Sequence, residues 1–440
     1  MSAHETILPT REEILAGSDR QSPAWLKTTC LVLGAVGILV FIIGAIMGVD
    51  RAWRALLFNW LYFTTVSSAG IMFVAVQRIT TARWSRPVTR FLEGYVAFLP
   101  VAFLLLLVIF AGRHHIFWWA NRVPEIAEKR IYLNPTFFFL RTIISFGIIA
   151  GLSLWFIYLS VRLDVGHIRE SGAEWARGIR ERMRRGFRDE RREIHSTHST
   201  QGKLAVALAF TFVYGWMVLA WDLSMSLDPS FQGTMYGWWV FMGGWVAALA
   251  SFTLLTMAWR KYLGRYDLIT ERHFHDLGKL CFAFTAFWGY LTFAQYLVIW
   301  YGNLGEETHW MRLRLIWPWE GLTIAVVVMM FVIPFFGLLS RAAKVYLPTM
   351  ALFALSTVVG LWFHRYLEVY PSIYGIAPSL PFGFWEIAVG LGYLGIWGYC
   401  YLSFMDAFPR FRVTLMTSPF RDEVQVPVNA ETMEPLPAHE

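Results

Sequence analysis

Long apolar runs recur along the whole chain, and they constrain its fold more than any other feature. A helix needs about 20 apolar residues to cross the hydrocarbon core of a bilayer. Runs of about this length occupy 26–49, 55–76, 91–112, 136–162, 203–223, 236–258, 279–301, 316–339, 346–368 and 383–408. Because a segment in lipid has to satisfy its own backbone hydrogen bonds, these runs predict helices. The predicted fold class is an all-α integral membrane protein with about ten transmembrane helices.

Charge content agrees with this class. Only 16% of the 440 residues are charged, against about 25% in a soluble domain.

The run 26–49 is longer than the apolar region of a signal peptide and no small-residue cleavage pattern follows it, so we expect it to remain as a span. The runs 316–339 and 346–368 are joined by a short turn, and a merged or re-entrant arrangement stays open there. Pro100 and Pro334 fall within runs and predict helix kinks.

Basic residues predict the orientation. The connections 77–90, 163–202, 259–278 and 340–345 hold half of the lysines and arginines, whereas 224–235 and 369–382 hold none. The connection 113–135 is a partial exception, because it also carries four basic residues. Positively charged connections stay in the cytoplasm. We therefore expect a multi-pass protein of the bacterial inner membrane with both termini cytoplasmic.

The same reading divides the chain into five parts. They are a cytoplasmic N-terminal tail (1–25), four transmembrane helices (26–162), an arginine-rich cytoplasmic connection (163–202), six further helices (203–408) and a cytoplasmic C-terminal tail (409–440). The connection contains "RGIRERMRRGFRDERRE". Pairing with the head groups of membrane lipids is the favoured interpretation of this segment, and docking of a cytoplasmic partner is the second. Nucleic-acid binding is disfavoured because no accompanying fold is present.

Redox ligands are not recognisable in the sequence. Cys30, Cys281 and Cys400 are isolated within apolar runs, and no CxxC or CxxCH motif occurs, so we expect no iron–sulfur cluster or c-type haem on this chain. Only His364 of the eleven histidines lies clearly inside a run, which disfavours a bis-histidine haem. We expect neither a metal nor a redox cofactor bound by this chain, and no catalytic residue is assigned.

Ionisable residues inside membrane spans are functional candidates. Seven candidates for proton transfer lie near the predicted periplasmic ends of spans, with Arg141 expected as a charge partner for the acids: Arg141, Asp222, Glu320, His364, Arg365, Glu368 and Glu386. His364 and Glu368 are four residues apart and share a helix face, and such a pair can accept and relay protons near neutral pH. The alternative is a purely structural role for these residues. Arg365 then pairs with Glu368, and His364 is a packed, hydrogen-bonded side chain.

A second group lies at the predicted cytoplasmic start of the seventh span. It comprises His273, His275, Asp276 and Lys279. Two histidines at a spacing of two point to different faces of a helix, which is poor geometry for one metal ion. Asp276 suits the first turn, where the helix dipole favours an acid. A capped helix start is the favoured interpretation, and cytoplasmic proton uptake is the second.

Three segments carry a resemblance to a known family. They read "HDLGKLCFAFTAFWGYLTFAQYLVIWYGNLGEET", "MSLDPSFQGTMYGWWVFMGG" and "KRIYLNPTFFFLR". They resemble the ActF family of NrfD-like (polysulfide reductase type) membrane subunits of alternative complex III, over about residues 50–408. The resemblance implies an NrfD-like bundle of about ten helices and a quinol-oxidising respiratory complex.

The resemblance also implies partners and cofactors. Quinol or menaquinol would be oxidised in the membrane, and iron–sulfur clusters and c-type haems on partner subunits would carry the electrons. Expected partners are a paralogous NrfD-like subunit, an iron–sulfur subunit, c-type cytochrome subunits and a terminal oxidase as acceptor. Whether this chain binds quinone, conducts protons or acts as a scaffold stays open.

A secondary transporter is the alternative from another class. Ten spans, buried acids and kinked helices are typical of such proteins. Against it, the ionisable residues lie near the ends of the runs and no convincing internal repeat is visible. A pure assembly scaffold is the third hypothesis.

Overall fold

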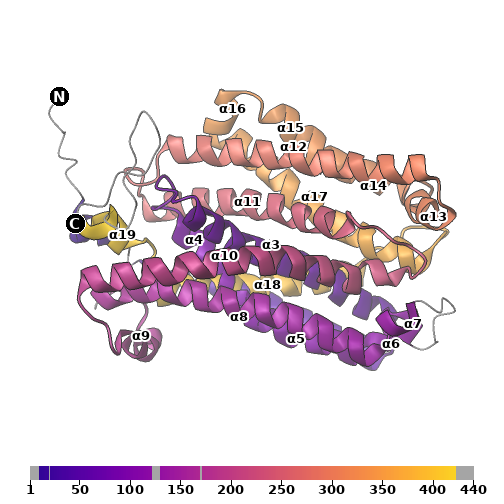
Figure 1. Ribbon diagram of the computed structural model, residues 1–440, viewed down its shortest axis with the longest axis horizontal. Helices are drawn as coiled ribbons and strands as arrows, with labels where there is room; N and C mark the ends of the chain where they lie inside the picture. Colours follow the sequence, from indigo (N-terminus) through magenta and orange to yellow (C-terminus); the bar gives the residue numbers. More distant parts are fainter. Residues whose placement is uncertain (1–8, 19, 121–128, 169–170, 423–440) are drawn as a thin grey trace.

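The computed structural model describes residues 9–18, 20–120, 129–168 and 171–422 (Figure 1). Ten helical segments are long and apolar enough to cross a membrane, and the described residues contain no β-strand. The ten segments are α2 (Ala24–Ile46), α3 (Asp50–Ile79), α4–α5 (Thr89–Ala111), α8 (Pro135–His167), α10 (Glu190–Leu223), α11 (Tyr236–Leu263), α12 (Glu271–Gly302), α14–α15 (Glu320–Gly337), α17 (Leu347–Tyr374) and α18 (Phe384–Ala407). The predicted all-α membrane fold is confirmed.

Helix α3 forms the centre of the bundle and contacts α10, α11, α17 and α18. Its side chains are buried on all sides through the membrane-length part. Polar groups of α3 join it to its neighbours: Trp397 Nε1 donates to Ser67 Oγ (2.9 Å) and Trp362 Nε1 donates to Asn59 Oδ1 (2.8 Å). Interhelical hydrogen bonds of this kind hold membrane helices together where the hydrophobic effect cannot.

Glycines bring α2 against α18. A Cβ atom on Gly37 would lie only 2.2 Å from the Cα atom of Gly392. The two backbones therefore touch, which only glycine permits at this crossing. Close approach through small residues is a common basis of helix association in membranes.

Two transmembrane segments contain breaks in their α-helical geometry. The α14–α15 segment has a π-helical turn at Val328–Val332, which ends two residues before Pro334. In the α4–α5 segment a 3₁₀ turn at Gly94–Phe98 precedes Pro100. Proline has no N–H to donate and its ring clashes with the carbonyl four residues earlier, which explains both departures from α geometry.

The structure adds detail to the predictions for two regions, the connection 163–202 and the pair of runs 316–339 and 346–368. The connection expected at 163–202 is largely helical, because α8 continues to His167, α9 spans Arg177–Arg184 and α10 starts at Glu190. The run pair that left a re-entrant arrangement open forms two separate helices, the α14–α15 segment and α17, which contact each other and are linked through α16 (Arg341–Val345).

The short helices lie at the two ends of the bundle (Figure 1). One end holds α1 (Arg11–Leu15), α9, α16 and α19 (Val413–Thr417), and the other holds α6 (Arg113–Ile116), α7 (Lys129–Tyr132) and α13 (Gly305–Arg314). Helices α1 and α19 contact each other. The described parts nearest the two termini therefore meet at one end, which we call the basic end because the arginine-rich α9 lies there.

Candidate functional site

The seven residues expected at one end of the spans do not form a single site. Asp222 and Arg141 pair with each other, Glu386 pairs with Arg51 of α3, and Glu320 is exposed in the first turn of α14. The remaining three, all from α17, form one buried cluster: His364, Arg365 and Glu368. All seven residues lie toward the end of the bundle opposite the basic end. This placement follows from the direction in which each of their helices runs.

The Asp222 pair is fully satisfied. Both carboxylate oxygens accept from Arg141, at 3.0 Å from Nε and 2.5 Å from Nη2. Thr142 Oγ1 donates to the same carboxylate (2.9 Å), and so does the hydroxyl of Tyr132 (3.0 Å). Burial, and secondarily the carboxylate charge, raise the pKa of Tyr132, which therefore remains a donor. A carboxylate with four donors joins α7, α8 and α10, and this geometry favours a structural role.

The Asp222→Asn substitution is therefore expected to lower stability by about 2 kcal/mol, since it leaves the largely buried Arg141 cation without its carboxylate. Thermal unfolding of the purified protein in detergent measures the loss. Glu320→Gln is the control, because an exposed residue is expected to change stability by less than about 0.5 kcal/mol. Equal unfolding temperatures for Asp222→Asn and the wild type would exclude this role.

Glu386 is likewise held on all sides. Arg51 donates to both of its oxygens, at 3.0 and 2.6 Å, and Tyr370 donates to Oε1 at 2.7 Å. The backbone N–H of Gly383 donates to Oε2 at 2.8 Å, which caps the start of α18. This carboxylate ties α3, α17 and α18 together, and its hydrogen-bonding capacity is largely used by these partners.

The α17 cluster differs because it has unused polar atoms. Arg365 donates to Glu368 Oε1 (2.5 Å) and to the carbonyl of Val240 in α11 (2.6 Å). Nδ1 of His364 lies 3.2 Å from the same Glu368 oxygen, yet among the described residues neither ring nitrogen has a hydrogen-bond partner. Oε2 of Glu368 and Nε1 of Trp288 also lack one there. Unsatisfied buried polar groups cost about 1–3 kcal/mol each, so their grouping points to a ligand position.

The His364 ring is fixed by its neighbours. It meets Trp239 of α11 edge to face at 4.4 Å between ring centroids, and Trp288 of α12 at 5.6 Å. Gly243 permits this arrangement, because a Cβ atom there would lie 3.4 Å from Nε1 of Trp288 and 3.0 Å from Cδ1 of Leu361. The imidazole is therefore held in place by packing, without a hydrogen bond.

A cavity of about 360 Å³ adjoins this cluster, among α11, α12, α13, α17 and the α14–α15 segment. His364 and Glu368 line it together with mainly aromatic and aliphatic side chains. Phe293, Tyr296 and Val327 are exposed and also line it, so the cavity opens on the outer surface of the bundle. Its volume lies within the usual range of small-molecule sites, about 300–1,000 Å³. We call this space the His364 cavity.

Arg314 also lines the His364 cavity, and the sequence reading missed it because it lies in a connection. Its guanidinium donates to the carbonyls of Leu367 (3.1 Å) and Trp310 (2.7 Å) and to Ser372 Oγ (2.9 Å). Burial lowers the pKa of Arg314 to about 10, so it is still a cation at neutral pH. It places a fixed positive charge on the cavity wall.

The four residues at the start of the seventh span form no joint site. Nδ1 of His273 accepts from the backbone N–H of Thr270 (3.1 Å), and Lys279 donates to Asp276 (2.8 Å). His275 lines a separate surface depression with Arg272 and Arg341. No group of three metal-ligating side chains occurs among the described residues. Helix α12 starts at Glu271, so Asp276 lies in its second turn and not in the first turn as expected. His273 makes the capping contact with Thr270, which agrees with a capped helix start.

A buried ionic cluster near the basic end was also missed. Arg90 bonds to Glu93 and to Asp164, and Arg412 lies 3.0 Å from Glu93 Oε1. Ser160 Oγ donates to Glu93 at 2.7 Å. Asp164 falls just outside the apolar run 136–162, so run boundaries placed it in a connection. Its two acids and two arginines balance, which indicates a structural cluster.

Comparison with known proteins adds no identification. Neither a scan against protein-family models nor a search of the curated proteins found a match.

Proposed function

We propose that this chain is an integral subunit of a quinol-oxidising respiratory complex of the bacterial inner membrane, with both termini cytoplasmic, and that the His364 cavity receives the quinol head group. The observation that carries the proposal is an apolar cavity, open on the outer surface of the bundle, that ends at an imidazole whose ring nitrogens have no hydrogen-bond partner among the described residues. The sequence resemblance to NrfD-like subunits of alternative complex III supports the same function.

The proposed chemistry follows from what quinol oxidation releases. Conversion of a quinol to a quinone gives up two electrons and two protons, so the hydroxyl groups need proton acceptors within hydrogen-bond reach. A ring nitrogen of His364 would accept the first proton from one hydroxyl, and the Glu368 carboxylate, which also lines the cavity and whose Oε2 has no hydrogen-bond partner among the described residues, would accept the second proton. Glu368, 3.2 Å from Nδ1, would stabilise the resulting imidazolium, and the fixed Arg365 keeps Glu368 oriented. Electrons would leave to redox centres on partner subunits.

A tagged pull-down from native membranes in mild detergent tests the proposal. We expect several co-purifying subunits and a reduced-minus-oxidised spectrum with haem c absorbance. Addition of quinol to the oxidised preparation should reduce that haem, and a head-group inhibitor should block the reduction. A single, folded and colourless chain would contradict the proposal and would put the secondary transporter first.

A further inference from the structure

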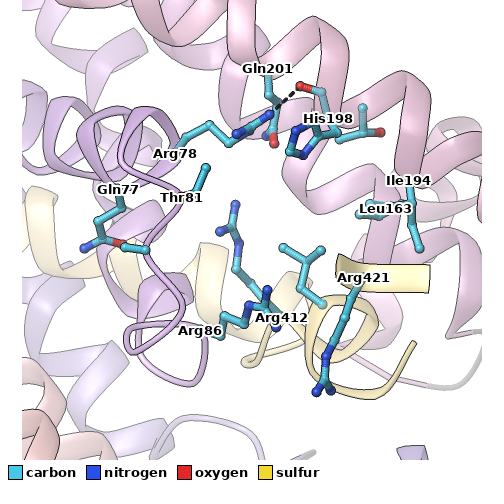
Figure 2. Close-up of a pocket in the computed structure, with 13 residues that line it drawn as sticks. Gln77, Arg78, Thr81, Arg86, Leu163, Ile194, His198, Gln201, Arg412 and Arg421 are labelled. Carbon is cyan, nitrogen blue, oxygen red and sulfur yellow. Dashed lines mark hydrogen bonds between the residues drawn. The ribbon is translucent and has the colours of Figure 1, made fainter. Parts of the chain in front are cut away.

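Two cavities of the bundle differ in how well their polar side chains are matched within the protein. A small cavity of about 70 Å³ lies between the end of α3, α8, the first turns of α10 and the segment around α19 (Figure 2). Four arginines line it, and none of the four is without a partner. Nη2 of Arg78, for example, donates to the backbone carbonyl of His198 at 2.7 Å, the dashed line in Figure 2. The positive charges of this wall therefore do not call for a ligand.

The His364 cavity differs because it holds an indole N–H without a partner. Trp239 and Trp288 both line this cavity. Nε1 of Trp239 donates to Oγ1 of Thr292 (2.9 Å), whereas Nε1 of Trp288 is buried and has no hydrogen-bond partner among the described residues. Trp288 is only 1% exposed, so bulk water does not reach its ring. Because an indole N–H can donate but not accept, the missing partner of Trp288 has to be an acceptor.

Trp288 and His364 present their nitrogens to the same small space. Their rings meet edge to face, with the centroids 5.6 Å apart. A Cβ atom on Gly243 would lie 3.4 Å from Nε1 of Trp288 and 3.8 Å from Nδ1 of His364. The missing side chain at Gly243 therefore leaves room beside both nitrogens. The indole nitrogen is a fixed donor, whereas the imidazole can accept a hydrogen bond or, once protonated, donate one.

This combination of groups fits one type of ligand atom. We propose that Nε1 of Trp288 donates to the same oxygen of the quinol head group whose proton His364 accepts, an inference that rests on the proposed function of the cavity. A quinol hydroxyl donates to the imidazole and at the same time accepts from the indole N–H. After oxidation the oxygen is a carbonyl, which accepts from the indole and from the protonated imidazole. An ammonium group has no lone pair with which to accept from Trp288, so the pair selects a hydroxyl or carbonyl oxygen and holds it in both oxidation states.

Equilibrium binding of short-chain quinones to the purified, tagged preparation tests this role. A benzoquinone and a naphthoquinone are each titrated in detergent by isothermal calorimetry. Trp288→Phe removes the N–H and keeps an aromatic ring, and it is expected to weaken quinone binding about two- to tenfold, the loss of one neutral hydrogen bond. Gly243→Ala keeps the indole and places a methyl group beside both nitrogens, so it should weaken binding as well. Trp245→Phe is the matched control, because Nε1 of Trp245 is likewise buried without a partner in the described part of the chain but lies outside the cavity lining.

A ligand without oxygen separates the hydrogen bond from packing. The corresponding hydrocarbon, in which hydrogen replaces the two ring oxygens, should bind equally well to the wild type and to Trp288→Phe. Weaker quinone binding by Trp288→Phe and Gly243→Ala, with hydrocarbon binding unchanged in Trp288→Phe, supports the proposal.

Three other results would overturn it. Equal quinone binding by the wild type and both variants removes the role of Trp288 and leaves the proposed function standing. Equal weakening of quinone and hydrocarbon binding in Trp288→Phe assigns Trp288 to packing. A wild-type preparation that binds neither quinone removes the proposed function and this inference together. Thermal unfolding of each variant shows whether it is folded, and Gly243→Ala decides the matter if Trp288→Phe is not.

Discussion

If this chain has the proposed function, replacement of His364 by glutamine is expected to slow quinol oxidation by the assembled complex about 100- to 10,000-fold, the usual contribution of a positioned acid–base group. Glutamine keeps hydrogen-bonding atoms at the end of the His364 cavity but cannot take up a proton. The effect should therefore appear mainly in kcat, while KM for quinol changes little. Quinol-dependent reduction of the haem c that the proposal expects to co-purify measures both constants.

The control for this experiment is His309→Gln. His309 is an exposed histidine in α13 and lies outside the His364 cavity lining, so its replacement should leave turnover unchanged. The pH profile gives a further readout, because a rate limited by imidazole titration loses that dependence in His364→Gln. Unchanged turnover with all subunits present would assign His364 to packing alone and would favour the scaffold hypothesis. Loss of partner subunits from the preparation would show a role in assembly.

The number and order of the spans could be predicted because each one is a long apolar run, and in lipid such a run has few alternatives to a helix. Helix ends could not be predicted as well. Helix α10 begins at Glu190, well before the apolar run at 203, because a charged helix in water is as acceptable as an apolar one in lipid. Hydropathy detects only the part of a helix that lies in the membrane.

From the sequence, only those residues of the candidate site that lie on one helix could be grouped together. A spacing of four residues places His364 and Glu368 on one face of α17 wherever that helix lies. Spacing does not reveal which faces of distant helices meet, so the pairing of Asp222 with Arg141 required the structure. Arg314 also escaped detection, because it reaches the His364 cavity from a connection. Glu320 was placed inside a run that started at 316, whereas its helix begins at Glu320 itself and leaves the side chain exposed.

The second large effect is expected at the buried ionic cluster. Arg90 is fully buried and bonds to Glu93 and Asp164. Arg90→Leu would leave two buried carboxylates facing one remaining cation, Arg412. Breaking a buried ion pair by removing one partner costs about 3–5 kcal/mol, because the uncompensated charge stays buried. We expect a fall of several degrees in the unfolding temperature in detergent, followed by intrinsic tryptophan fluorescence, and a lower yield of monodisperse protein.

A second substitution separates charge from packing in this cluster. Adding Asp164→Leu to Arg90→Leu leaves one acid, Glu93, opposite one cation, Arg412, at 3.0 Å. Since the unpaired charge causes most of the cost, the double variant should recover part of the lost stability, a non-additivity expected of residues in contact. Arg192→Leu, at an exposed arginine of α10, should change stability by less than about 0.5 kcal/mol. If the double variant unfolds at the same temperature as Arg90→Leu or lower, lost packing and not lost charge balance explains the role of Arg90.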